Sequence, residues 1–343
     1  MHAPPSRART STRKVNLATK RLAPAALDSQ LLPERAPEFL SFMKKREALR
    51  VAKAAGAAWP WSDDDVLNAF KFTNVKREHD RTTAWMREHF TPRAATSSAG
   101  TTVFNCALFR CFGTTAMGEA VGWSDGEYDA EAVVRAAQAC RAEHGHAFTP
   151  AYCLPRYNSE ITSADAARRT YESVCSKTLQ GVWDRREQLG RACGTGSWRA
   201  LCDELRGVSG FGGSGFMAKE VALDVMQTPH LRLCHDRNDW CPIGPGARRG
   251  LNRLHRRPTT QAVSVVGGPC EQRFLKEMSA LFDEIRRVEP TWCDSLALEL
   301  HDVQFQLCEF DKYERIRCSE GGKKTKYPRP LAAAQGVARM KVE

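Results

Sequence analysis

The spacing of apolar and polar residues predicts helices over most of the chain. Strand-like runs are few and short, near 101–104 and 263–266. We therefore expect an all-α protein with few or no strands, arranged in two helical lobes. Apolar side chains recur every three or four positions, the period of an amphipathic helix, in segments 38–54, 62–70, 75–90, 129–143, 163–190, 197–206, 214–226, 246–256 and 271–286.

The two ends of the chain lack this periodicity. Residues 1–27 hold six basic side chains and no acidic one. We predict a disordered basic arm at 1–30, a disordered tail at 328–343 and a helical domain at 37–327. The arm fits a nuclear signal, an organelle transit peptide or a DNA-contacting tail, and the sequence does not separate these.

Charge and cysteine usage narrow the class of protein. The 343 residues carry a net charge of +11, which favours a polyanionic partner such as DNA. No segment approaches the roughly 20 apolar residues of a membrane span, so no membrane partner is expected. The 13 cysteines are scattered, without a CxxC motif or a preceding secretory signal. We expect reduced, buried thiols in an intracellular, DNA-associated protein, and an iron–sulfur site is the weaker alternative.

Five glycines separate two predicted helices in the segment 207–218, GVSGFGGSGFMA. Glycine lets the backbone take positive φ or approach a ligand closely. Helix, glycine turn and helix over 197–226 resemble the helix-hairpin-helix element, in which turn amides bind one DNA phosphate. The alternative is a tight corner between helices with no ligand. The phosphate site would comprise Gly210, Gly212, Gly213 and Ser214, with Ser214 capping the second helix.

A second glycine-containing turn precedes the segment that begins at 246. Arg248 and Arg249 fall in the first helical turn, where the helix dipole disfavours cations unless an anion lies nearby. Arginine suits phosphate oxygens because it offers paired donors. Gly244, Gly246 and the two arginines are therefore candidate phosphate ligands, and a solvated arginine pair is the alternative.

Two acidic residues follow the glycine turn by about two dozen positions, where helix-hairpin-helix DNA glycosylases carry a catalytic Asp. Asp239 is the preferred candidate because it adjoins Trp240 and the Gly-Pro-Gly turn, and Asp236 is the alternative. A carboxylate beside an extruded base can accept a proton or stabilise a developing cation. No lysine stands at the position that bifunctional glycosylases use, so lyase activity is not expected.

Segment 70–85, FKFTNVKREHDRTTAW, places polar residues at helical spacing. A helix here would align Asn74, Arg77 and Arg81 on one face, with Asp80 close to it. The apolar segment 104–113 carries Asn105 and Arg110, which need buried partners, and Asp80 is one candidate. A structural salt-bridge network is the alternative. Segment 307–314, LCEFDKYE, adds Lys312 to a candidate polar site.

Five segments together resemble one family. They are similar, in this order, to the helical domain of 5-hydroxymethyluracil DNA kinases and of their relatives, the α-glutamyl/putrescinyl thymine pyrophosphorylases. The resemblance covers about residues 37–327 and implies a fold like that of helix-hairpin-helix DNA glycosylases. The segments read FKFTNVKREHDRTTAW, NCALFRCFG, GVSGFGGSGFMAKEVALD, DWCPIGPGARRGL and LCEFDKYER.

The resemblance implies hypermodification of a base in double-stranded DNA. An amine, from an amino acid or a polyamine, would displace pyrophosphate from an activated 5-hydroxymethyluracil that is extruded from the helix. Arginines would stabilise the leaving pyrophosphate, an acid would take a proton, and no cofactor or metal is expected. The catalytic candidates are Asp239, Arg77, Arg81, Asp80 and Asn74.

Two other functions stay open for the same residues. The printed sequence lacks the P-loop pattern GxxxxGK[ST], so kinase activity is not carried over and a separate DNA kinase would be a partner. A glycosylase that excises a modified base shares the expected fold and the Asp. A non-catalytic DNA-binding partner of such a kinase would use the glycine turn alone.

Overall fold

A computed structural model describes residues 30–149, 163–213, 215–264, 267–321 and 325–328. The predicted arm and tail thus lie almost wholly outside the described residues. Within the described part there is no strand, and one isolated bridge joins Phe70 to Lys326. The prediction of an all-α fold is confirmed. Over the same residues, no helix combines the length and the apolarity that a membrane span needs.

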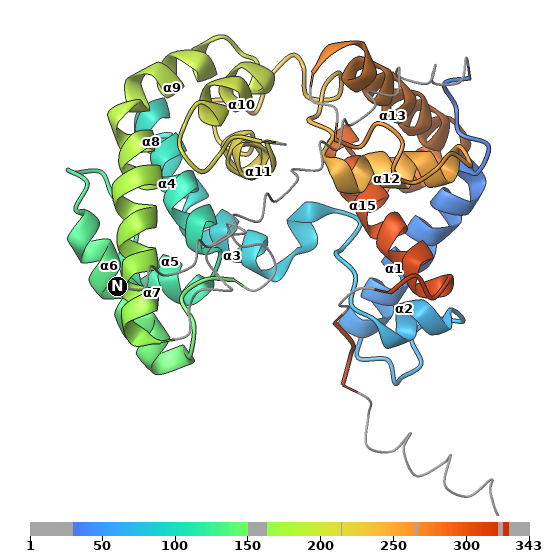
Figure 1. The fold of residues 1–343 in the computed structure, drawn as a ribbon, viewed down its shortest axis with the longest axis horizontal. Helices are drawn as coiled ribbons and strands as arrows, with labels where there is room; N and C mark the ends of the chain where they lie inside the picture. The colour runs from blue at the N-terminus through green and yellow to red at the C-terminus, as the bar shows by residue number, and fades with distance from the viewer. Residues whose placement is uncertain (1–29, 150–162, 214, 265–266, 322–324, 329–343) are drawn as a thin grey trace, which may run out of the picture.

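The helices form two lobes (Figure 1). The middle lobe, residues 77–240, contains η1 (Arg77–His79), α3 (Arg81–His89), η2 (Thr91–Ala95), α4 (Ala99–Phe112), α5 (Thr115–Val121), α6 (Ala130–His144), α7 (Ala164–Ser173), η3 (Val174–Leu179), α8 (Gln180–Asp184), α9 (Arg186–Gly194), α10 (Trp198–Arg206) and α11 (Phe216–Val225).

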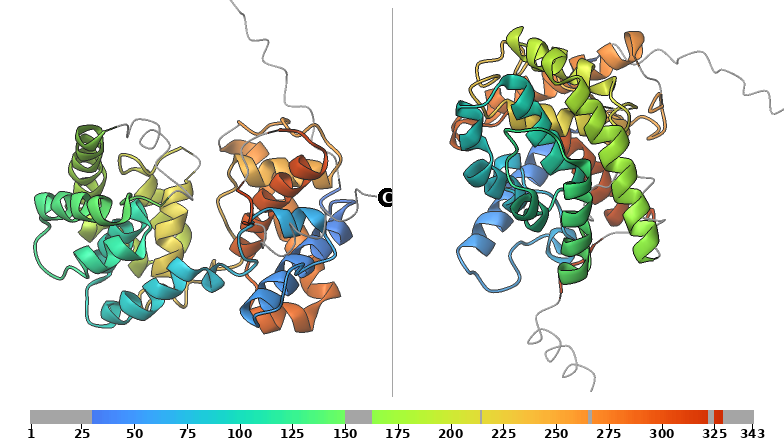
Figure 2. Two further views of the ribbon diagram at one scale, coloured as in Figure 1. Left: turned by 90° about the horizontal axis from the view of Figure 1, so that it is seen from below. Right: turned by 90° about the vertical axis from the view of Figure 1, so that its left-hand side faces the viewer.

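The terminal lobe is built from both ends of the described chain, residues 30–76 and 241–328. The chain crosses between the lobes twice, between α2 and α3 and again between α11 and α12, and the lobes stay distinct when seen from below (Figure 2, left). The terminal lobe contains α1 (Ala36–Ala54), α2 (Asp65–Ala69), α12 (Pro245–Leu254), α13 (Gly268–Val288), α14 (Pro290–Leu296) and α15 (Leu300–Arg317).

Helix α4 forms the centre of the middle lobe. It packs against α9 and α11, and nearly all of its residues are buried. A helix that is buried on every side has no polar face, so its sequence lacks the helical period. The expectation of a strand near 101–104 is therefore wrong. The second strand-like run, 263–266, ends in residues outside the described part, and residues 263–264 form a turn.

Helices α12 and α15 pack closely in the terminal lobe. A Cβ on Gly250 would lie 2.2 Å from the carbonyl oxygen of Leu307. At Gly246 it would lie 2.8 Å from Sγ of Cys308. Both glycines therefore serve close approach between helices, because any side chain at these positions would push the two backbones apart.

We expect Gly250→Ala to lower the free energy of unfolding by about 1–3 kcal/mol, because the added methyl must displace backbone atoms of α15. Urea unfolding followed by circular dichroism measures the change. Gly126→Ala is the matched control, since a Cβ there meets no atom within 4 Å. Equal stability of the two variants would show that α12 and α15 are not this close.

Candidate functional site

A cavity of about 310 Å³ lies between the two lobes. The middle lobe contributes η1, α3, α4 and the start of α11, and the terminal lobe contributes residues 73–74 and α15. Its chemistry is mixed, because cations, carboxylates and aromatic rings all line it. The residues that carry this chemistry are Arg77, Arg110 and Lys219, then Asp80, Glu220 and Glu309, and the rings of Phe216 and Phe305.

Asp224 organises a buried ion network behind this wall. Its carboxylate accepts hydrogen bonds from Arg77 and Arg87, each at 3.0 Å, and from Arg110 at 2.5 and 2.8 Å. Burial alone would raise the pKa of Asp224, but the charges of Arg110, Arg77 and Arg87 outweigh it and hold the pKa well below its usual range. Asp224 is therefore an anion that fixes two of the three cavity cations.

Glu220 stands one helical turn before Asp224 on α11. Its Oε2 accepts from Arg77 Nη2 at 3.3 Å, whereas its buried Oε1 accepts no hydrogen bond among the described residues. Burial would raise the pKa of Glu220, but the charge of Arg77, followed by those of Lys219 and Arg110, lowers it. Glu220 is thus a buried carboxylate whose Oε1 can accept a hydrogen bond or a proton from a ligand.

Lys219 connects the two lobes at the cavity wall. Its ammonium donates to Gln304 Oε1 at 2.6 Å and lies 3.5 Å from Glu220 Oε1. The same ammonium lies 3.5 Å from the ring centroid of Phe305, a cation–π distance. Gln304 and Phe305 both belong to α15, so a side chain of the middle lobe is held by the terminal lobe.

The sequence prediction missed Lys219, Glu220 and Asp224. The helical period marked Met217, Ala218 and Val221 as core and left the charged positions to solvent, yet nine of the ten residues of α11 are buried. A usable signal was present, because charged residues stood in an otherwise apolar helix. The same signal did mark Arg110 in α4.

Three candidates from segment 70–85 line the cavity, namely Asn74, Arg77 and Asp80. The single helix predicted for 75–90 is wrong, because Asp80 caps α3 by accepting from the backbone N–H groups of Thr82 and Thr83. The chain before it is an irregular segment and the short η1. Arg81 begins α3, is exposed and does not line the cavity.

Arg110 and Asn105 both lie on α4 but act in different places. Arg110 lines the cavity, and it donates to Asp224 and Thr83 rather than to the expected Asp80. Asn105 donates to the carbonyl of Ser124 and accepts from the Ser124 N–H, each at 2.8 Å. It therefore fixes the loop after α5 and takes no part in the cavity.

The glycine turn joins α10 to α11 as predicted for 197–226. Gly210 and Gly213 have φ of 93° and 70°, which favours glycine, whereas Gly212 has no such requirement. Ser214 lies outside the described residues. The residue that precedes α11 is Gly215, without a side-chain cap, so the predicted serine cap is wrong. Binding of a DNA phosphate by this turn stays a prediction.

The second set of phosphate candidates serves packing in the terminal lobe. Gly244 precedes α12, and Gly246 contacts α15. Arg248 is buried, donates to the Ile243 carbonyl at 2.8 Å and lies over the ring of Phe274. Arg249 pairs with Asp311 at 3.0 Å. None of these residues lines the cavity, so phosphate binding by them stays a prediction without geometric support.

Lys312 lies on α15 beside the cavity residue Glu309. Its ammonium donates to the Lys71 carbonyl at 2.7 Å and to Glu309 at 3.1 Å. It also lies 4.7 Å from the ring centroid of Phe72. The side chain thus ties the crossing segment to α15, and it does not line the cavity itself.

The acidic candidates beyond the glycine turn lie away from the cavity. Asp236 accepts from the backbone N–H groups of Trp198 and Arg199 and from the Ser197 hydroxyl, so it caps α10. Asp239 is exposed in the following turn. Neither lines the cavity, and the catalytic role of Asp239 stays a prediction that its position does not support.

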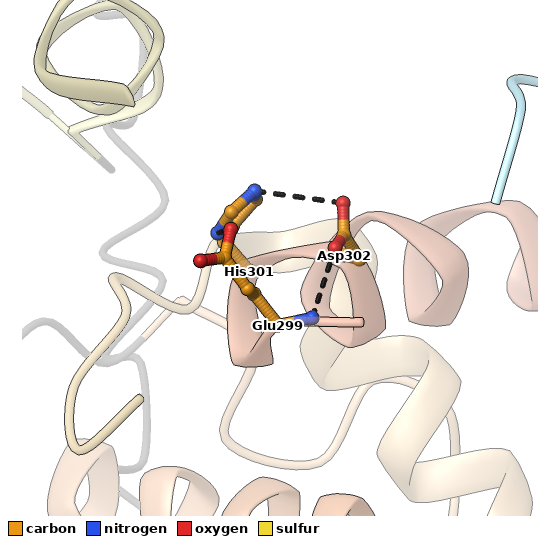
Figure 3. Close-up of side chains that lie close together, drawn as sticks. All are labelled: Glu299, His301 and Asp302. Carbon is orange, nitrogen blue, oxygen red and sulfur yellow. Dashed lines mark hydrogen bonds and ion pairs between the residues drawn. The ribbon is translucent and has the colours of Figure 1, made fainter. Parts of the chain in front are cut away.

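Glu299, His301 and Asp302 gather at the start of α15 (Figure 3). One ligand atom from each lies within 4.8 Å of the others, as a metal site would require. Lys76, however, lies 3.3 Å from Glu299 and 3.0 Å from Asp302, and Arg237 lies 2.6 Å from Glu299. The side-chain cations of Lys76 and Arg237 thus already neutralise the two carboxylates that a metal ion would need as ligands. The cluster joins the lobes by ion pairs, close to the cavity.

His301 makes stability depend on pH. It is 1% exposed, and burial lowers its pKa from 6.5 to about 3. The unfolded chain binds a proton near pH 6.5 that the folded protein accepts only near pH 3, so this contribution to stability is present above pH 6.5 and is lost as pH falls. We expect unfolding free energy to drop by about 2–3 kcal/mol between pH 6.5 and 4.5 from this group. Urea unfolding across this range measures it.

The control is His301→Gln, which should flatten the pH dependence in that window. The exposed His144→Gln should leave it unchanged. An undiminished slope in His301→Gln would contradict the assignment.

Comparison with known proteins identifies the chain's family. Residues 34–323 match the family described as "5-hmdU DNA kinase, helical domain". The chain belongs to this family. A curated relative, the 5-hmdU DNA kinase of Bacillus phage SP10, is 26% identical over 307 residues, which cover 83% of this chain and 45% of the relative. The chain therefore spans less than half of the length of that relative. No solved structure matches.

The family membership confirms the resemblance drawn from the five segments. Four of the five segments contribute residues to the interlobe cavity. The fifth, DWCPIGPGARRGL, contributes none. The likeness to helix-hairpin-helix DNA glycosylases stays a prediction.

Proposed function

We propose that this helical domain holds an extruded 5-hydroxymethyluracil-type base of DNA in the interlobe cavity and there joins an amine to it, releasing pyrophosphate. One observation carries the proposal. Segments 70–85, 105–113, 207–224 and 307–315 are far apart in the chain, yet each sends side chains into the same cavity. Motifs that converge on one concave site with paired charges favour a binding or catalytic role over a purely structural one.

The aromatic residues suit a base that has left the DNA stack. Phe216 is 39% exposed at the cavity, and Phe305 lies on the opposing lobe. An unstacked base regains stacking energy on such rings. A cavity of about 310 Å³ also falls at the small end of ligand pockets, which suits a pyrimidine with a short substituent.

The polar residues suit substitution at the 5-methylene carbon. The nitrogen of the amine would form the new C–N bond while the C–O bond to the pyrophosphate breaks with its electron pair on oxygen. Cations at the wall favour the departing anion, and a buried carboxylate accepts the proton that the new C–N bond displaces from nitrogen. Glu220 replaces Asp239 as our candidate for this proton acceptor. A separate DNA kinase, or a kinase segment of a longer chain, would supply the activated base.

Nucleoside mass spectrometry tests this function. DNA containing 5-hydroxymethyluracil, first activated by a DNA kinase, is incubated with the protein and a pool of amino acids and polyamines. We expect a heavier nucleoside that carries the amine, together with free pyrophosphate. The control is the same DNA without activation, which should stay unmodified.

The other outcomes separate the alternatives. Abasic sites would replace the transferase with a glycosylase. DNA that is bound but chemically unchanged would favour a non-catalytic binding module, and either result would contradict the proposal.

A further inference from the structure

The three cations of the cavity differ in how firmly their charges are held. Arg77 and Arg110 form charge-assisted hydrogen bonds of 2.5–3.0 Å to the fully buried Asp224. Among the described residues, the carboxylate oxygen nearest to the Lys219 ammonium is Glu220 Oε1, 3.5 Å away. The ammonium donates its hydrogen bond to the neutral Gln304. Lys219 therefore has the most to gain from an anionic ligand.

The ion network beside Lys219 is itself positive, and the two further carboxylates of the lining are already engaged, Asp80 by backbone N–H groups of α3 and Glu309 by the Lys312 ammonium. The ion network around Asp224 and Glu220 contains four cations and three carboxylates, which leaves one positive charge in excess. A low-dielectric wall strengthens the attraction of that charge for an incoming anion. The members are Arg77, Arg87, Arg110 and Lys219 with Glu78, Glu220 and Asp224.

We propose that Lys219 is the group that binds the departing diphosphate, and that Glu220 holds its ammonium until the substrate arrives. This inference rests on the proposed function and assigns to a lysine the role that the resemblance implies for arginines. When the diphosphate oxygens take the ammonium, Glu220 Oε1 loses its nearest cation. That oxygen is then available as the proton acceptor for the attacking amine.

The step balances in atoms and charge. The nitrogen lone pair of the amine forms the C–N bond, and the C–O electron pair leaves with the diphosphate, next to the Lys219 ammonium. One N–H proton passes from the alkylated nitrogen to Glu220 and then to solvent. The order matters, because the Lys219 ammonium, 3.5 Å from Glu220 Oε1, keeps that oxygen less basic until a bound anion draws the ammonium away. Binding of the activated base would thus prepare its own proton acceptor.

Inorganic pyrophosphate is the probe that tests this site apart from catalysis. Isothermal titration of the whole protein should show binding, and Lys219→Met should weaken it by about tenfold or more, because a charge-assisted contact is lost. Glu220→Gln should tighten binding, since no carboxylate then competes for the ammonium. Lys44→Met removes a lysine charge on the surface, outside the cavity, and should leave affinity unchanged.

A further variant guards against misfolding of Lys219→Met. Gln304→Glu places a carboxylate at the 2.6 Å partner of the ammonium and should weaken pyrophosphate binding. Tighter pyrophosphate binding in Glu220→Gln together with weaker binding in Gln304→Glu would support transfer of the Lys219 ammonium from Glu220 to the diphosphate. A Lys219–Glu220 pair with a purely structural role would not produce these opposite shifts in affinity. Unchanged affinity in Lys219→Met, or weaker binding in Glu220→Gln, overturns it.

Failure of this inference is distinguishable from failure of the proposed function. If the wild-type protein binds no pyrophosphate at millimolar concentration yet forms the amine-bearing nucleoside, Lys219 is not the anion site and the transferase stands. If the affinity shifts are as expected but no nucleoside forms, the anion site stands and the transferase does not.

Discussion

Asp224→Ala is expected to lower the free energy of unfolding by about 3–5 kcal/mol. The carboxylate is fully buried and is shared by Arg77, Arg87 and Arg110. Its removal leaves guanidinium charges in the interior with too few acceptors. The pKa of Asp224 lies below its unfolded value, so this contribution is present above about pH 4 and is lost as pH falls further.

Urea unfolding at neutral pH measures this effect. Asp203→Ala on α10 is the matched control, because Asp203 is exposed and its arginine partners lie 3.8 and 3.9 Å away. It should change stability by less than about 0.5 kcal/mol. An Asp224→Ala protein as stable as this control would mean that the buried network does not hold the middle lobe together.

Glu220→Gln is expected to slow formation of the amine-bearing nucleoside by about 100- to 1,000-fold. Glutamine keeps the shape of the side chain but accepts no proton. Single-turnover reactions on kinase-activated DNA, quenched and analysed as nucleosides by mass spectrometry, give the rate. The free energy of unfolding is measured in parallel, so that loss of the Arg77 contact is seen separately from loss of chemistry.

The control for this prediction is Asp239→Asn, the acid favoured by the sequence pattern. It is exposed and outside the cavity, so the rate should change by no more than about twofold. A large loss of rate in Asp239→Asn together with a normal rate in Glu220→Gln would instead identify Asp239, in the turn after α11, as the proton acceptor.

The sequence predicted the helical class and many of the helices, but it missed the two that matter most for the cavity wall. Helix α4 is buried on every side, and α15 buries polar residues such as Asp302 and Gln304 in contacts between the lobes. Neither shows a clean apolar stripe. The hydrophobic period identifies helices with one solvated face, so helices buried in the centre escape it.

The residues of the candidate site were predicted only in part. Arg110 stood out because a cation in an apolar segment needs a partner, and Arg77 because it falls at helical spacing with other polar residues. The structure gives both of them Asp224 as a partner. That partner is far away in sequence, so spacing alone did not reveal it. Arg248 was selected because it stands in the first turn of a predicted helix, yet it donates to the Ile243 carbonyl and lies over the Phe274 ring. A buried arginine in a sequence therefore predicts a network of polar partners, but it does not predict whether that network lines a ligand site.

The central claim, that the interlobe cavity receives the base, is tested most directly by photocrosslinking. DNA with a single 5-iodouracil at the modified position is bound, irradiated and digested, and the crosslinked peptide is located by mass spectrometry. The account predicts crosslinks at Phe216 or Phe305, the two rings of the cavity. Crosslinks confined to residues 227–246, around Asp239, would contradict it.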